Sequence, residues 1–123
     1  SKKFITDIQA MIMKMNKSLA RIKNKRFMSY HPAWSYLARD FGLEEVAIES
    51  ENRDPSSREL VNLIKFARQE NINIIFISPQ FNRKSADVLA KAINGRVVML
   101  DPLEKNYLFN LNKFMVLIGA ELE

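Results

Sequence analysis

The residues with the clearest potential for chemistry stand at the ends of short apolar runs. The only histidine in the 123 residues, His31, follows the run at 26–30. Later runs end in polar residues in the same way, at Glu49, at Ser78-Pro79-Gln80 and at Asp101-Pro102. In an open sheet of parallel strands the carboxyl ends meet at one edge, where ligands bind. This spacing predicts that the polar side chains converge on one rim.

His31 and Asp101 are the residues in this set that suit a metal ion. Neutral imidazole and carboxylate are ligands for zinc, manganese and iron(II), and the absence of cysteine excludes thiolate sites. Two ligands leave half of a first shell empty, so a second partner must complete it. Taken alone, the residues leave other interpretations open: His31 as a structural or surface histidine, and Asp101 as a turn-forming acid before Pro102.

The sequence patterns of several enzyme classes are missing. One histidine and no cysteine exclude a Cys–His pair and a two-histidine zinc-protease motif. The three glycines form no G-x-S-x-G elbow, phosphate-binding loop or dinucleotide fingerprint. We therefore expect a protein that is not an enzyme.

The positive charge lies at the start of the chain. The net charge is +5, yet residues 1–26 contain eight basic side chains and the single acid Asp7. Such asymmetry occurs on surfaces that bind nucleic acid or anionic membranes, but no nucleic-acid motif accompanies it. A solvated helix face is the favoured interpretation. A small basic α/β module that binds nucleic acid, or a protein partner without metal, is the alternative.

Helices and strands are predicted to alternate. Isoleucine, methionine and leucine recur at three- and four-residue steps over 4–23, which is typical of an amphipathic helix. Further helices are expected at 32–41, 56–70, 84–93 and 106–122, and strands at 26–30, 45–49, 73–78 and 96–100. Pro32 suits a first helical turn, Gly42 a helix end, and Ser56 with Glu59 a capping box. The order predicts an α/β fold: a four-stranded, mostly parallel sheet with helices on both faces.

The length fits one domain. No apolar stretch approaches the roughly 20 residues of a membrane span. The opening Ser1-Lys2-Lys3 has no initiator methionine and no hydrophobic signal core, so we expect a processed or excised chain.

Several segments together resemble a known family. They are Tyr30-His31-Pro32-Ala33-Trp34 and the residues that follow to Leu43, then Ile48-Glu49, Asp54-Pro55-Ser56, Ser78-Pro79-Gln80-Phe81 and Leu100-Asp101-Pro102-Leu103. In order and spacing they resemble the C-terminal lobe of the zinc-type metal-receptor proteins of bacterial and archaeal ABC importers. The resemblance extends from about Ile5 to the end of the chain. Ser78 departs from it, because many relatives have Glu or Gln there.

The resemblance implies a receptor of two lobes joined by a long helix, with the metal held between them. Residues 1–24 would then be a segment of the connecting helix and residues 25–123 the C-terminal α/β lobe. His31 would be the imidazole ligand and Asp101 the carboxylate ligand, directly bound in manganese-type relatives and sometimes only nearby in zinc-type ones. Glu49 and Gln80 are candidates to hydrogen-bond the ligands.

The resemblance also implies a function. The whole receptor would capture zinc (Zn2+, with Mn2+ as the alternative) with high affinity and deliver it to an ABC permease, outside the cytoplasm in the periplasm or on the outer face of the membrane. The missing N-terminal lobe would supply the other ligands, so the isolated lobe would bind metal weakly or stand empty. Apolar surface left without that lobe predicts self-association as a homo-oligomer.

Overall fold

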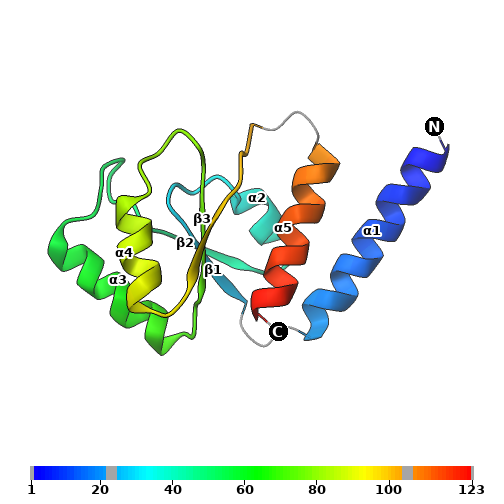
Figure 1. Cartoon of the computed structure of the whole chain (residues 1–123). Helices are drawn as coiled ribbons and strands as arrows, with labels where there is room; N and C mark the ends of the chain where they lie inside the picture. The colour runs from blue at the N-terminus through cyan, green and yellow to red at the C-terminus, as the bar shows by residue number, and fades with distance from the viewer. Residues whose placement is uncertain (1, 22–24, 104–106, 123) are drawn as a thin grey trace.

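A computed structural model describes residues 2–21, 25–103 and 107–122 (Figure 1). Within these residues helices and strands alternate, as the sequence predicts. They are α1 (Lys2–Arg21), β1 (Arg26–Ser29), α2 (Ser35–Asp40), β2 (Glu44–Ala47), α3 (Ser57–Gln69), β3 (Ile74–Ile77), α4 (Lys84–Ala92), β4 (Arg96–Met99) and α5 (Tyr107–Leu122).

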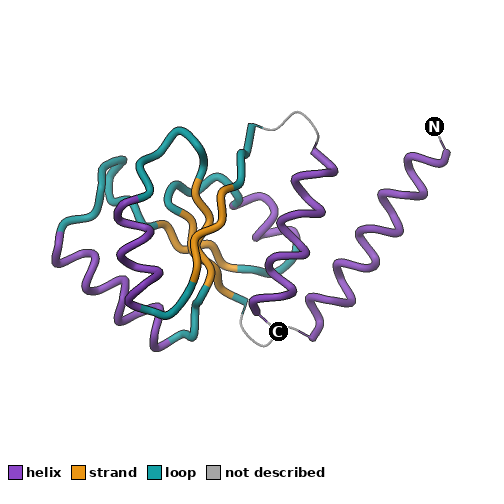
Figure 2. Tube along the Cα trace, in the orientation of Figure 1, coloured by secondary structure: helices purple, strands orange, loops and turns teal. Residues whose placement is uncertain are grey.

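The four strands form one parallel sheet in the order β2-β1-β3-β4. Figure 2 shows the strands at the centre of the α/β unit, with helices on either side. The predicted α/β architecture is confirmed. Since the sheet is parallel, all four strands end at the same edge, which we call the carboxyl edge; the opposite edge is the amino edge.

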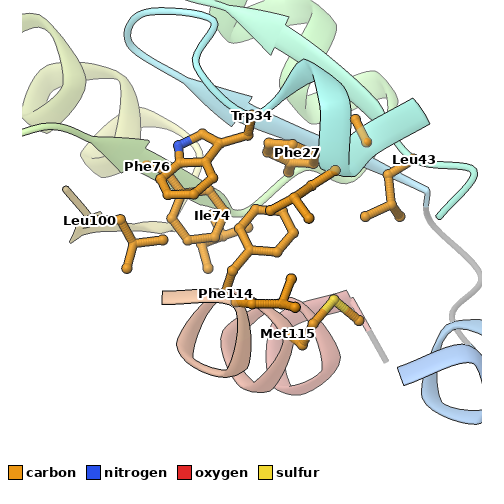
Figure 3. Close-up of a cluster of buried hydrophobic side chains, with 11 residues drawn as sticks. Phe27, Trp34, Leu43, Ile74, Phe76, Leu100, Phe114 and Met115 are labelled. Atoms are coloured by element: carbon orange, nitrogen blue, oxygen red, sulfur yellow. The ribbon is translucent and has the colours of Figure 1, made fainter. Parts of the chain in front are cut away.

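Each face of the sheet has its own hydrophobic core, because side chains alternate along a strand. On β1, Phe27 faces α2 and α5, whereas Met28 faces α3 and α4. The first core is rich in aromatic residues (Figure 3) and contains Phe27, Trp34, Leu37, Ala38, Leu43, Ile74, Phe76, Leu100, Leu111, Phe114 and Met115. The second is mainly aliphatic and contains Met28, Tyr30, Ile48, Ala67, Ile72, Ile75, Ile77, Ala86, Leu89 and Ala90.

Phe114 of α5 holds the first core together. Its ring lies 5.3 Å from that of Phe27, 5.2 Å from Phe76 and 5.5 Å from Trp34, measured between centroids. Trp34 is thereby buried. Trp34, the residue just before α2, is therefore fixed to the sheet through α5.

The start of α2 differs from the sequence prediction. The helix begins at Ser35 with Trp34 as its N-cap residue, so Pro32 lies in the preceding loop rather than in a first helical turn. Gly42 follows the end of α2 with φ of +68°, the left-handed conformation that ends many helices. The predicted capping box of α3 is present, since Ser56 and Glu59 exchange side-chain to backbone hydrogen bonds at 3.0 and 3.2 Å.

Helix α1 lies alongside α5, on the outside of the α/β unit (Figure 1). Three residues of its predicted apolar stripe have described side chains: Ile8 is half-buried, whereas Ile5 and Ile12 are exposed. The side chains of Met11, Met15 and Leu19, and the whole of Ile22, lie outside the described residues. Among the helices of the described ranges, none has the length and apolar character to cross a membrane.

Candidate metal centre

Four polar residues selected from the sequence follow the ends of four different strands at the carboxyl edge. Across the sheet their order is Glu49 after β2, His31 after β1, Gln80 after β3 and Asp101 after β4. Strand β3 therefore lies between the strands that lead to His31 and Asp101. Hydrophobic periodicity carries no information on strand order, so the sequence pattern alone could not place these two residues relative to each other.

The strands bring His31 and Glu49 together. Ser29 of β1 is level with Ala47 of β2, and the next two backbone bonds join Ile48 N–H to Ser29 O at 2.9 Å and Glu49 N–H to Tyr30 O at 3.0 Å. Just beyond this ladder, Nδ1 of His31 contacts a carboxylate oxygen of Glu49. The Glu49 side chain is 9% exposed and the His31 side chain 41%. The pair thus has a buried acceptor and an imidazole that reaches solvent.

This contact determines which nitrogen of a neutral His31 can bind a metal. An ionised carboxylate only accepts hydrogen bonds, so Nδ1 must be the protonated nitrogen that donates to Glu49. The lone pair of the neutral ring then lies on Nε2. A hydrogen bond from the other ring nitrogen to a carboxylate is the common way in which proteins orient a metal-binding histidine.

Aromatic rings hold the other side of the imidazole. Phe81, in the turn after β3, stacks on His31 with 5.4 Å between centroids and 28° between planes. Phe81 also contacts Tyr30, whose hydroxyl donates to Asp54. Burial, aided by that hydrogen bond, raises the pKa of Tyr30 to about 12, so the hydroxyl remains a donor at neutral pH. His31 is thus held by Glu49, which follows β2, and by Phe81, which follows β3.

Asp101 occupies a turn. Its Oδ1 accepts a hydrogen bond from Leu103 N–H at 2.9 Å, and Asn110 donates to its backbone oxygen at 2.5 Å. With strands about 4.8 Å apart, two strand spacings separate the ends of β1 and β4 by about 10 Å. Gln80 is exposed and Ser78 is buried in the segment between them. Within the described residues, no three His, Asp or Glu side chains gather into a set that could hold a metal ion.

Two acids near His31, Glu45 and Asp54, are given no site role by the sequence patterns. Glu45 accepts hydrogen bonds at both ends of the loop that carries His31, and Asp54 accepts from Tyr30. The position of Glu45 within its strand could have indicated its role. Glu45 is level with the core residue Phe27 on β1, so the two side chains lie on the same face of the sheet. A carboxylate on that face needs hydrogen-bond donors.

The sequence and fold match known zinc-uptake proteins. A family model described as "Zinc-uptake complex component A periplasmic" matches residues 1–115. The high-affinity zinc uptake system protein ZnuA of Bacillus subtilis is 30% identical over 106 residues, which is 85% of this chain and 33% of that protein. The zinc-binding lipoprotein AdcA of Streptococcus pneumoniae is 31% identical over 103 residues, covering 82% of this chain and 21% of AdcA.

A crystal structure of ZnuA superposes with a TM-score of 0.89 at 30% identity, over 99% of this chain and 48% of that chain. The chain therefore spans about half the length of this solved structure and a third or less of the two related sequences.

Proposed function

This chain belongs to the family of the periplasmic zinc-uptake component A, and we propose that it is the C-terminal, metal-coordinating lobe of a zinc receptor that serves an ABC importer. In this proposal residues 1–24 are a segment of the connecting helix and residues 25–123 form the lobe. The relatives that match carry names for zinc uptake and zinc binding, and the structural match spans nearly the whole chain but half of a ZnuA structure.

The observation that carries the proposal is the His31–Glu49 pair at the carboxyl edge. Because the Nδ1–H of His31 donates to Glu49, the unprotonated Nε2 of His31 is the atom that binds zinc. Glu49 orients the ring and strengthens Nε2 as a ligand without contacting the metal. Phe81 limits rotation of the same ring by stacking on it.

Asp101 contributes the carboxylate side of the site, with Gln80 between it and His31 as a hydrogen-bonding residue. The Asp101 turn uses one carboxylate oxygen, Oδ1, and a carboxylate has two. The position of β3 favours Asp101 either as a ligand on the far side of the ion or as a partner of a metal-bound water. Imidazole with one carboxylate suits zinc, and a shell richer in oxygen ligands suits manganese.

The remaining ligands come from a second lobe that packs over α1 and the carboxyl edge. Helix α1 leaves several large apolar side chains exposed, among them Phe4, Ile5 and Met13 at 52, 56 and 62%. Such surface is typical of a covered interface. In the absence of the second lobe, the same surface favours self-association of this chain, which analytical ultracentrifugation over a range of concentrations would detect.

The proposed place of action is outside the cytoplasm, where the receptor passes zinc to the membrane permease. Binding and release need no covalent step, so the lobe is not an enzyme. The basic residues of α1 give no support to nucleic-acid binding beyond their charge. A gel shift that weakened steeply with salt would be the evidence for that alternative.

Calorimetric titration with zinc tests the proposal. The wild-type chain is expected to bind weakly, and joining it to an N-terminal lobe of the family should strengthen binding by orders of magnitude, because the remaining ligands are then preorganised. His31→Ala should remove most of the zinc affinity in either form, and Asp101→Ala should weaken it less. Arg83→Ala, which removes an exposed ion pair with Asp87, is the control. Equal zinc affinity for wild type and His31→Ala would overturn the proposal.

A further inference from the structure

The acid next to the start of β2, Glu45, reaches the loop that carries His31. It is level with Phe27 of β1 and lies on the same face of the sheet as α2. Its neighbour Glu44 lies at the amino edge, where it pairs with Arg26. Two successive acids of one strand therefore have different surroundings, and only one of them approaches the candidate site.

Three donors converge on the Glu45 carboxylate. Oε2 accepts from the Ser29 hydroxyl at 2.7 Å and from the backbone N–H of Trp34 at 3.1 Å. Oε1 accepts from the Ser35 hydroxyl at 3.1 Å. Ser29 and Trp34 are both buried, so loss of the carboxylate would leave polar groups without their acceptor.

These donors stand on both sides of His31. Ser29 is the last residue of β1, Trp34 is the last residue of the loop 30–34 and Ser35 is the first residue of α2. One carboxylate therefore joins the two ends of this loop. The side chain of the N-cap residue Trp34 makes no capping hydrogen bond, and the backbone N–H of Trp34 donates to Glu45. The short loop therefore has both ends fixed to β2, the strand that also leads to Glu49.

We propose that Glu45 is a positioning residue of the metal site. By fixing the loop 30–34 to β2, it sets the distance between the His31 ring and Glu49, and so keeps the proton on Nδ1 and the lone pair on Nε2. The inference deepens the proposed function and rests on it, because the importance of Nε2 assumes that His31 binds zinc. Glu45 itself does not contact the metal.

The tautomer of His31 provides a direct test, because the chain contains one histidine and its ring signals need no assignment. A long-range proton–nitrogen-15 NMR spectrum of the metal-free chain at about pH 8, where a free imidazole is neutral, measures how the proton is shared between Nδ1 and Nε2. We expect the Nδ1-protonated form to dominate in the wild type. Glu45→Ala should lower the ratio of the Nδ1-protonated to the Nε2-protonated form about fivefold, because the hydrogen bond from His31 to Glu49 weakens.

Two variants separate hydrogen bonding from charge. Glu45→Gln should keep the wild-type tautomer, because the amide oxygen can replace Oε2 while the amide nitrogen donates to the Ser35 hydroxyl. Glu44→Ala, which removes an equal charge from the same strand, should also leave the tautomer unchanged.

Ser29→Ala removes one donor while keeping the carboxylate, and it should shift the ratio in the same direction as Glu45→Ala by a smaller factor. It serves as the measured variant if Glu45→Ala does not fold.

If Glu45→Ala folds, a wild-type tautomer ratio in this variant would overturn the proposal. If Glu45→Ala does not fold, the proposal would be overturned by a Ser29→Ala variant with the same tautomer ratio as Glu44→Ala. Circular dichroism establishes which case applies. In zinc titrations, Glu45→Ala should bind about tenfold more weakly than Glu44→Ala. The NMR result does not depend on metal. Unchanged zinc affinity in His31→Ala would therefore contradict the proposed function, whereas an unchanged tautomer would contradict the role of Glu45.

Discussion

The two edges of the sheet use charged side chains differently. At the amino edge, Arg26 pairs with Glu44 at 3.0 Å and with Glu70 at 2.8 Å, and these three side chains are between 31 and 59% exposed. At the carboxyl edge, Glu49 is 9% exposed and Glu45 accepts from three donors. Exposed ion pairs contribute little to stability, whereas a partly buried carboxylate that accepts several hydrogen bonds fixes local geometry.

Within one small sheet, residues that contribute only to the fold therefore lie at one edge and the residues of the proposed zinc site lie at the other. The amino edge is where backbone segments must meet closely, and its ion pairs are peripheral to that packing. The carboxyl edge contains the one imidazole, together with the acids and the phenyl ring that orient it. Substitutions at the amino edge should therefore change the free energy of unfolding without changing zinc affinity in the folded protein. Substitutions around His31 should weaken zinc binding even in variants that fold.

The largest expected effect on stability is at Gly95, at the amino edge. A Cβ there would lie 2.4 Å from the backbone oxygen of Asn73, the atom that accepts a hydrogen bond from Arg96 N–H at 3.0 Å. Because this obstacle is backbone, Gly95→Ala should lower the free energy of unfolding by about 3 kcal/mol. Urea denaturation measures the loss.

Gly42→Ala is the matched control. Its Cβ would meet no atom within 4 Å, but its φ of +68° disfavours alanine, so we expect a loss of about 1 kcal/mol. Equal losses for the two glycine variants would contradict the steric explanation for Gly95. A changed zinc affinity in folded Gly95→Ala would contradict the separation of the two edges.

The next largest effect is expected at Glu49. Glu49→Ala leaves Nδ1 of His31 without its acceptor, and loss of such a partner weakens metal binding by about 10- to 100-fold. Glu49→Gln should have a smaller effect, because an amide oxygen still accepts from Nδ1–H. Calorimetric zinc titration measures both, with Glu44→Ala as the control. The orienting role of Glu49 would be refuted by a Glu49→Ala chain that binds zinc as tightly as the wild type.

A pH-dependent effect is expected at Glu59, at the start of α3. Hydrogen bonds from Ser50, from the backbone and hydroxyl of Ser56 and from Arg53 lower the pKa of Glu59 to about 2 from an ordinary 4.5. A lowered pKa in the folded state means that the ionised form stabilises the fold above about pH 4.5. This stabilisation should disappear as the pH falls from 4.5 towards 2.

Unfolding measured between neutral pH and pH 2 tests this prediction. Glu59→Gln should be less stable than the wild type at neutral pH, and the difference should shrink as acid protonates Glu59 in the wild type. A difference that stayed constant with pH would show that the capping geometry matters and the charge does not.

The smallest effect is expected from the amino-edge ion pairs. Arg26→Gln should change the free energy of unfolding by less than about 1 kcal/mol, because all three charges are partly hydrated. The change should be smaller still at high salt, where screening weakens exposed pairs. Urea denaturation at low and high salt measures it. A loss as large as that of Gly95→Ala would mean that the amino edge depends on charge rather than on backbone packing.

The secondary structure could be predicted from the sequence because each element has a local signal. Apolar periodicity and the Ser56–Glu59 capping box gave the helices and strands to within a few residues. The start of α2 was the exception. Pro32 is a good first helical residue by its local conformation, but α2 begins only at Ser35, where Glu45 accepts from Trp34 and Ser35. That acceptor lies on another strand, so local propensity could not reveal it.

The candidate site was only partly predictable. The pattern of polar residues after apolar runs placed His31, Glu49, Gln80 and Asp101 at strand ends. Sheet order was not readable from the pattern, because each strand is a similar apolar run, and order decides that His31 lies next to Glu49 while β3 lies between His31 and Asp101. The roles of these residues as metal ligands remain predictions for the titrations to test.

Trp34 gives the molecule a built-in optical reporter. It is the only tryptophan, it is 2% exposed, and it stacks on Phe114 of α5. Trp34 is the last residue of the loop that contains His31, and its backbone N–H donates to Glu45. A shift of this loop would change the surroundings of the indole ring, so its intrinsic fluorescence should follow both unfolding of the aromatic core and local movement near the imidazole, without a label.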